Sequence, residues 1–119
     1  MKIPPRSPAT LKDLREWRAS IGGGADSVAL VCGTFHMLQP GNLAAIRRAK
    51  LHSGHVCVIL EPGDKTGTPR TGKRPSISLA ERAEMVSHLK DMDLVASFDP
   101  ASEKKRLECL RPYIWLHCD

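Results

Sequence analysis

Two continuous apolar runs of strand length most constrain how this chain of 119 residues folds. The first run covers residues 28–32, and the second is HVCVIL at residues 55–60. Runs without polar alternation are typical of strands that are buried on both faces, as in a parallel sheet covered by helices. The segment PGNLAAIRRAKLHSG lies between them and has apolar residues at helical spacing. This order predicts a parallel strand–helix–strand unit.

The rest of the chain continues the alternation. Thr10 with Asp13 and Ser78 with Glu81 have the spacing of a capping box, so a helix is expected to start at each pair. Three glycines at positions 22–24 are expected to end the first of these helices. The further predicted elements are a strand at 93–98, a helix at about 101–110 and a strand at 113–117.

The helix between the two apolar strands is expected to pack on the sheet through one face. Leu43, Ile46 and Leu51 mark that face in the sequence. Gly54 is expected to end this helix, because glycine is the usual residue just beyond a helix C-terminus.

The predicted fold class is therefore α/β, a Rossmann-like three-layer α/β/α sandwich with a parallel sheet. The expected strand order is 3-2-1-4-5 or a truncated version of it, in one domain over residues 1–119. Within that domain, residues 1–25 form a helical lead-in and residues 26–119 form the α/β core. Ligands bind beyond the carboxyl ends of the strands in such sheets. The loops expected at that edge are 33–40, 61–77 and 98–100.

Composition narrows the function classes. The apolar runs are strand-sized and far shorter than the roughly 20 residues that cross a bilayer, so no membrane partner is expected. The N-terminal segment MKIPPRSPAT lacks the apolar stretch of a signal peptide, which favours the cytoplasm. The chain has four cysteines and no C-x-x-C pair. We therefore expect four free thiols and no zinc or other metal site.

The net charge is +5, and one basic segment stands out. Residues 65–74 contain two lysines and two arginines and no acidic residue. They form either a solvated loop or a phosphate-binding loop. The five aromatic residues are not interleaved with these basic residues, which argues against a nucleic-acid partner.

The segment VCGTFHMLQPGN at residues 31–42 is the strongest candidate for a site. It runs from a buried strand through a loop into a helix that begins at Pro40, and such a helix N-terminus can bind an anion. Asn42 is either a ligand of that anion or a local helix cap. His36 is either a phosphate contact or an ordinary loop residue.

Residues outside this segment have two interpretations as well. Arg82 either points into the crevice or forms a surface salt bridge. His52 and His55 are expected at the opposite end of the sheet, away from the site. His88 and His117 have no partner that the sequence identifies.

The order of these motifs resembles the cytidylyltransferase-like nucleotidyltransferases, which include the adenylyltransferase domain of ADP-heptose synthase and glycerol phosphate cytidylyltransferase. The first loop of this family has the pattern G-x-F-D-x-x-H-x-G-H. The similarity continues into GKRPSISLAER, where the family has R-P-V-x-x-x-x-E-R, and into LRPYIWLHCD, where it has L-K-P-D-x-x-V-K-G. The residues in the place of the first loop are Gly33-Thr34-Phe35-His36-Met37-Leu38-Gln39-Pro40-Gly41-Asn42.

Three departures accompany this resemblance. Gln39 and Asn42 replace both histidines of H-x-G-H, and His36 replaces the acidic residue. The sequence also ends at Asp119, before the family's G-R-T-x-G-x-S-T segment. Gly33, Phe35, Gly41, Arg74 and Arg82 remain in register, whereas the register of Lys65, Arg70 and Lys73 stays open.

The resemblance implies a nucleotidyltransferase of reduced activity that uses ATP or CTP with Mg²⁺ and a phosphorylated small molecule. The alternatives are a noncatalytic nucleotide- or phosphate-binding module of the same descent and an interaction domain without a nucleotide. A homodimer is left open. The catalytic positions that the resemblance implies are Gln39, Asn42, Lys73 and Arg82, and the nucleotide-binding positions are Gly33, Thr34, Phe35, His36, Gly41, Asn42 and Arg74.

Overall fold

The computed structural model describes residues 8–24, 27–35, 38–61, 78–97 and 101–118. The helices are α1 (Leu11–Ile21), α2 (Pro40–His52), α3 (Leu79–Ser87) and α4 (Glu103–Leu110). The strands are β1 (Val28–Gly33), β2 (His55–Leu60), β3 (Leu94–Ser97) and β4 (Ile114–His117). Helices and strands alternate along the chain as predicted.

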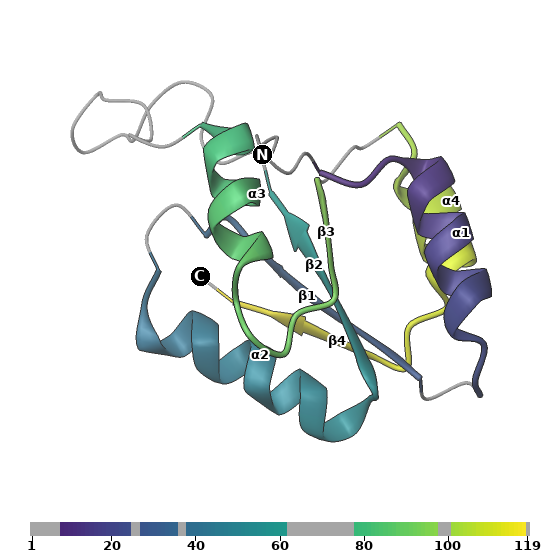
Figure 1. Ribbon diagram of the computed structural model, residues 1–119, viewed down its shortest axis with the longest axis horizontal. Coiled ribbons are helices and arrows are strands. Elements are labelled where there is room, and N and C mark those ends of the chain that lie inside the picture. Colours follow the sequence, from purple (N-terminus) through teal and green to yellow (C-terminus); the bar gives the residue numbers. More distant parts are fainter. Residues whose placement is uncertain (1–7, 25–26, 36–37, 62–77, 98–100, 119) are drawn as a thin grey trace, which may run out of the picture.

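The described strands form one parallel sheet in the order β3-β2-β1-β4. This order confirms the truncated form of the predicted 3-2-1-4-5 arrangement. The chain leaves β1 towards β2, whereas β4 pairs on the other side of β1 (Figure 1). The strand order therefore reverses between β1 and β4, and this reversal is the topological switch point at which such sheets bind ligands.

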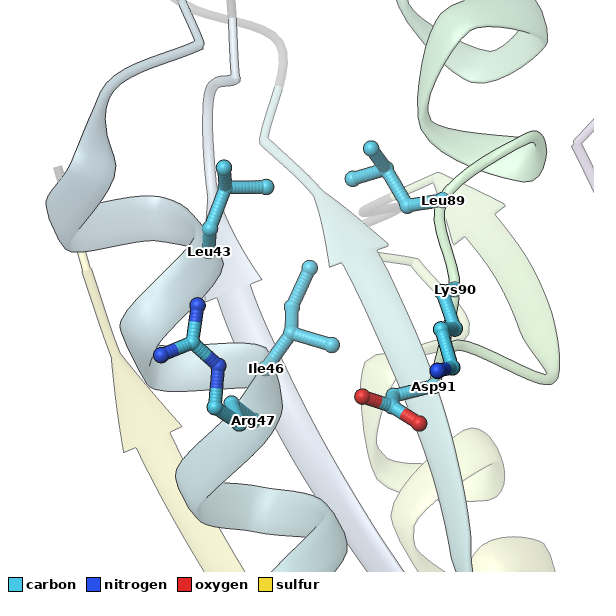
Figure 2. A pocket seen from close by; sticks show the side chains of 6 residues that line it. All are labelled: Leu43, Ile46, Arg47, Leu89, Lys90 and Asp91. Atoms are coloured by element: carbon cyan, nitrogen blue, oxygen red, sulfur yellow. The ribbon is translucent and has the colours of Figure 1, made fainter.

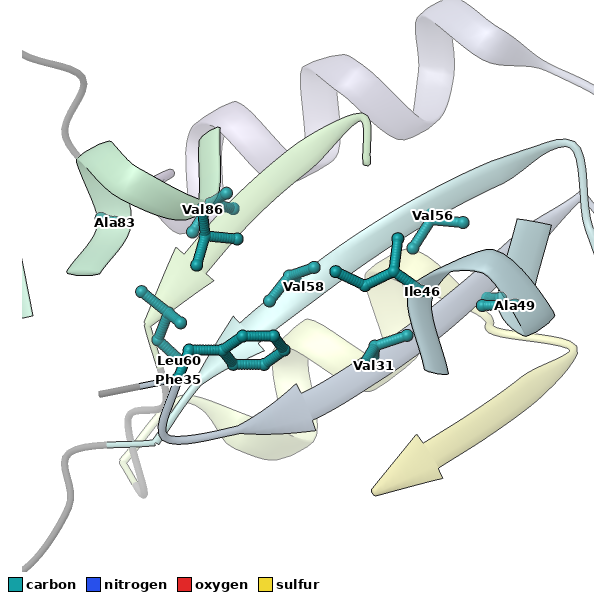
Figure 3. Close-up of a cluster of buried hydrophobic side chains, with 11 residues drawn as sticks. Val31, Phe35, Ile46, Ala49, Val56, Val58, Leu60, Ala83 and Val86 are labelled. Atoms are coloured by element: carbon teal, nitrogen blue, oxygen red, sulfur yellow. The ribbon is translucent and has the colours of Figure 1, made fainter. Parts of the chain in front are cut away.

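Helices cover both faces of the sheet, which makes the fold the predicted three-layer sandwich. The face that we call the α2 face is covered by α2 and α3, and its core includes Val31, Phe35, Ile46 and Val58 (Figure 3). The opposite face, which we call the α4 face, is covered by α1 and α4 over the alternate residues of the same strands. Burial of both strand faces explains why the two central strands are continuously apolar in sequence.

Both predicted capping boxes are present. The Thr10 amide donates to Asp13 at 2.9 Å, and the Ser78 amide donates to Glu81 at 3.1 Å. These backbone hydrogen bonds lower the pKa of both exposed carboxyl groups. The predicted glycine stop of α1 is also confirmed, since Gly22 follows the helix at φ +56°.

The predicted inner face of α2 is wrong at two positions. Leu43 is 39% exposed and Leu51 is 85% exposed, whereas Asn42, Ile46 and Ala49 are buried. Asn42, Ile46 and Ala49 recur at helical spacing and form the buried face, so hydrophobicity alone was a poor guide to orientation here. The helix ends at His52 with Ser53 as its cap, so the predicted stop residue Gly54 lies directly beyond the cap, without a positive φ.

All four cysteines are free in the structure, two of them buried in strands. Burial raises the pKa of the Cys32 thiol to about 12, and burial also raises that of Cys57. Within the described ranges, no helix combines the length and apolar character that crossing a membrane requires.

Candidate functional site at the carboxyl edge of the sheet

The end of β1 turns sharply into the candidate site. Gly33 is the last residue of the strand, and its carbonyl oxygen accepts a hydrogen bond from the Glu61 amide at 2.8 Å. Phe35 has a φ of +54°, a conformation that costs energy for a bulky residue. Its ring is buried in the core of the α2 face. The Phe35 side chain therefore anchors the turn. Because the ring is buried, the predicted contact of Phe35 with a nucleotide would have to use its backbone.

Helix α2 presents its N-terminus to this same edge. Pro40 has no N–H, and the amides of Asn42 and Leu43 donate to the Gln39 carbonyl oxygen at 3.0 and 3.3 Å. The first turn of a helix offers amides without helical acceptors and a partial positive charge. A Cβ atom on Gly41 would meet nothing within 4 Å. The Gly41 backbone is thus open to an approaching anion.

Asn42 acts as a helix cap in the structure. It is 5% exposed, and its Oδ1 accepts from the Gln39 amide at 3.0 Å. Its Nδ2 donates to the Cys118 Sγ at 3.5 Å. Of the two interpretations of Asn42, the structure therefore shows the local helix cap. A contact between this side chain and a phosphate would require both hydrogen bonds to rearrange. Gln39, by contrast, lies exposed at the helix start.

Arg82 is buried and joins the two loops that leave β1 and β2. Its Nη1 donates to the Thr34 carbonyl oxygen at 2.5 Å and to the Glu61 carbonyl oxygen at 2.7 Å. With 3% of its surface exposed, Arg82 lies in the interior, so the interpretation as a surface residue is wrong. The guanidinium fixes the spacing of two loops at the carboxyl edge.

Several predicted site residues lie outside the described residues. His36 is one of them, and the whole basic segment at 62–77 is another, including Lys73 and Arg74. The structure brings together Gly33, Thr34, Gln39, Gly41 and Arg82 at one edge of the sheet.

A further pair at this edge was missed by the sequence analysis. The His117 Nε2 lies 2.6 Å from the Glu61 Oε1. His117 ends β4 and pairs with Cys32 in the register, whereas Glu61 directly follows β2. The side chains therefore meet across the end of β1, between two strands that are not neighbours. Only the family pattern at LRPYIWLHCD marks this segment in the sequence, and it does not indicate a partner.

Three other described histidines lie away from the carboxyl edge of the sheet, as expected for two of them. His52 ends α2 and His55 begins β2, which places both at the amino edge of the sheet. His88 pairs with Glu84 at 3.1 Å on the exposed surface at the end of α3. None of these three contributes to the carboxyl edge.

Trp115 lies on the same side of β4 as His117. Its Nε1 donates to the Cys32 Sγ at 2.6 Å, while 51% of the residue is exposed. Glu61 and Glu103 both contribute to the raised pKa of Cys32, after burial as the largest cause. The Glu61 carboxylate and an exposed indole thus lie near the end of β1 on the α4 face.

A hollow of about 480 Å³ lies elsewhere on the molecule, on the α2 face (Figure 2). It runs between α2 and the turn that follows α3, and its lining residues are Leu43, Ile46, Arg47, Leu89, Lys90 and Asp91. Figure 2 shows it beside the strands rather than beyond their carboxyl ends. It contains none of the residues predicted for the site.

Metal ligands do not converge in the described part of the chain. No three His, Cys, Asp or Glu side chains are grouped there in a way that fits a metal ion. Magnesium in nucleotide sites is held largely by phosphate oxygens and water, with one or two carboxylates. The described residues therefore do not form a metal site by themselves.

Known proteins support the fold. A solved lipopolysaccharide core biosynthesis protein from Thermoplasma volcanium superposes with a TM-score of 0.60 at 21% identity, covering 75% of this chain and 71% of that chain. At this identity, the likeness shows the α/β fold with its parallel sheet and no more.

Curated relatives extend the comparison to sequence. The bifunctional protein HldE of Methylococcus capsulatus is 22% identical over 113 residues, which cover 95% of this chain and 24% of that protein. The FAD synthase of Thermococcus sibiricus is 37% identical over 68 residues, 57% of this chain and 45% of that protein. The chain thus spans less than half the length of each of these relatives. The family model described as cytidylyltransferase-like matches residues 30–117, and the chain belongs to this family of nucleotidyltransferase-type proteins.

Proposed function

We propose that this chain binds ATP or CTP, together with Mg²⁺, and transfers the nucleotidyl group to a phosphorylated small molecule such as a sugar phosphate. The observation that carries the proposal is the open first turn of α2 at the carboxyl end of β1. Gly41 offers an amide there, and a Cβ atom at this position would meet no neighbour within 4 Å. The helix adds roughly half a positive charge at this point. Lys73 and Arg74 would add charge from the adjoining loop.

The proposed reaction forms one bond and breaks another at the α-phosphorus. An oxygen of the acceptor phosphate bonds to the α-phosphorus, and the bond to the bridging oxygen of the β-phosphate breaks. Pyrophosphate leaves with that electron pair. Charge accumulates on phosphate oxygens during this step, so fixed donors and positioning supply most of the catalysis. The Gly41 amide and the Arg82-braced loops would serve these two purposes.

Reduced turnover is part of the proposal. A hydrogen bond from a charged group contributes about 1.5–3 kcal/mol, against about 0.5–1.5 kcal/mol from a neutral amide. Gln39 and Asn42 stand where the family has histidines, and the Asn42 side chain is already bonded to Gln39 and Cys118. We therefore expect a loss of about 2–4 kcal/mol in the transition state, which corresponds to roughly a hundredfold in rate.

The second candidate is a noncatalytic module that binds a nucleotide or phosphate. The buried, bonded state of Asn42 favours it, because that side chain is not available to a reacting phosphate without rearrangement. Both candidates share the same binding surface, and they differ only in whether pyrophosphate is released.

The binding surface is tested by the substitution Gly41→Ala. The added methyl group meets no atom of the described residues within 4 Å and Gly41 does not have a positive φ, so the fold should keep its thermal stability. The methyl group would instead obstruct a phosphate at the helix N-terminus. We expect the affinity for ATP or CTP with magnesium, measured by calorimetry, to fall at least about tenfold, or 1.4 kcal/mol.

Gly54→Ala is the matched control. Its methyl group would also meet nothing within 4 Å, but Gly54 lies at the amino edge, before β2. This variant should bind like the unsubstituted protein. Unchanged affinity in Gly41→Ala would refute the site, and tight binding without pyrophosphate release from ATP or CTP with sugar phosphates would select the noncatalytic candidate.

A further inference from the structure

Glu61 and His117 form a bridge across the end of the central strand. Their side chains meet at 2.6 Å. Each is also fixed through the backbone: the Glu61 amide donates to the Gly33 carbonyl oxygen at 2.8 Å, and the residue after His117 donates to the Cys32 carbonyl oxygen at 2.8 Å. The pair therefore has a defined position at residues 32–33, although both side chains are partly open to solvent.

The pair lies on the α4 face, opposite the N-terminus of α2. Side chains alternate along a strand, and Cys57 and Ile59 belong to the core of the α4 face, which puts the Glu61 side chain on that side. Trp115, two residues before His117, bonds Cys32 of the same core. The switch point between β1 and β4 thus has a helix N-terminus on one face and the pair on the other.

The two faces suit different parts of one ligand. The first turn of α2 offers N–H groups, which phosphate oxygens accept. The α4 face instead carries the carboxylate of Glu61, whose side chain is 31% exposed. Ionised carboxylates only accept hydrogen bonds, so they repel phosphate and recognise hydroxyl groups. The exposed indole of Trp115 adds an apolar surface of the kind that packs against a sugar ring.

The imidazole completes a recognition element for neighbouring hydroxyls. Because Nε2 faces the carboxylate, Glu61 fixes the proton on that nitrogen and leaves Nδ1 on the other side of the ring. Each of two neighbouring hydroxyls can donate to one oxygen of the Glu61 carboxylate, which the His117 N–H holds in place.

We propose that the Glu61–His117 pair binds the vicinal hydroxyls of the sugar in the ligand, while the first turn of α2 holds its phosphate. This inference rests on the proposed function and names the specificity determinants of the same site. The sugar is either the ribose of the nucleotide or the sugar of the phosphorylated acceptor, and both present the same diol. Glu61 is the binding residue in this arrangement, and His117 is a positioning residue that orients its carboxylate.

The pair can be changed without unfolding the protein. The structural bonds of Glu61 use its backbone amide and carbonyl groups, and the His117 side chain is 63% exposed. Glu61→Gln and His117→Gln should therefore keep the melting temperature. His88→Gln is the matched control, because His88 is also an exposed histidine paired with a glutamate.

The test compares ligands that differ by one hydroxyl. Calorimetry with magnesium measures ATP against 2′-deoxy-ATP, and separately ribose 5-phosphate against 2-deoxyribose 5-phosphate. In the unsubstituted protein, one of the two pairs should differ in affinity by about tenfold or more, as expected for a hydrogen bond to a charged group. The nucleotide pair identifies the ribose of ATP as the source, and the sugar phosphate pair identifies the acceptor.

In Glu61→Gln and in His117→Gln, this difference should fall to about twofold or less, while His88→Gln keeps it in full. Equal affinity within both ligand pairs in the unsubstituted protein would overturn the inference, as would a difference that survives both substitutions. If ATP binds and pyrophosphate is released without any dependence on the pair, only this inference fails. If discrimination depends on the pair and no pyrophosphate appears, only the transferase activity fails.

Discussion

Replacing Arg82 by methionine separates a structural from a catalytic role for this residue. Methionine keeps much of the aliphatic length of the side chain and removes the guanidinium. The substitution deletes the hydrogen bonds from Nη1 to the carbonyl oxygens of Thr34 and Glu61. Arg82 is 3% exposed, whereas the two hydrogen bonds to these carbonyl groups are only partly buried.

The expected cost follows from those two bonds. A hydrogen bond to a charged group contributes about 1.5–3 kcal/mol to stability. Both carbonyl groups lie at the edge of the sheet, where water can replace part of the lost interaction, so we expect a total near the lower limit, about 2–4 kcal/mol. At about 4 °C per kcal/mol for a domain of this size, the melting temperature should fall by roughly 8–16 °C.

Thermal unfolding by circular dichroism measures this change, and calorimetry with ATP at a temperature well below the transition measures binding. Arg48→Met is the control, since Arg48 is exposed on α2 and its replacement should change the stability by less than about 0.5 kcal/mol. A structural Arg82 predicts a large loss of stability with a small loss of affinity. An unchanged melting temperature with abolished binding would refute this reasoning and make Arg82 a ligand group.

Two further predictions follow from shifted pKa values. The pKa values of Asp13 and Glu81 are lowered in the folded state, so the stabilisation that they provide is present above their ordinary values of 3.8 and 4.5 and is lost as the pH falls through the lower folded values. Urea unfolding between pH 6 and pH 3 should show this loss, and the double variant Asp13→Asn/Glu81→Gln should have a flatter profile; an identical profile would contradict it. Because the thiolate is the reactive form, the raised pKa of Cys32 and of Cys57 should make these thiols slow to react with a thiol reagent at pH 8 in the folded protein. All four thiols should react in denaturant without reductant, and a count of two would disprove the free state.

The parts of the fold that depend on local chemistry were predictable from sequence. A capping box is formed by two residues three positions apart, so the starts of α1 and α3 could be placed at Thr10 and Ser78. The two central strands are continuously apolar because both faces are covered, and this property predicted the parallel sheet and its order.

The orientation of α2 was not predictable in the same way. Two of its three large apolar residues, Leu43 and Leu51, are exposed, whereas Ile46, Ala49 and Asn42 are buried. The polar Asn42 is accommodated there because the Gln39 amide and the Cys118 sulfur are its hydrogen-bond partners. Cys118 lies 76 positions away in the sequence, so a local hydrophobic pattern carries no signal for this contact.

The contact between His117 and Glu61 was also not predictable from a local sequence pattern. The resemblance places Gln39 and Asn42 at the positions of the two motif histidines, so it predicts a site without those two imidazoles. In the folded protein, β4 brings the imidazole of His117 to the same edge of the sheet. It contacts the carboxylate of Glu61, which lies 56 positions away in the sequence. Their meeting depends on β2 and β4 lying on opposite sides of β1, which is a property of the strand order and not of any motif. The assembled sheet, rather than any motif, therefore shows that an imidazole and a carboxylate stand together at the switch point.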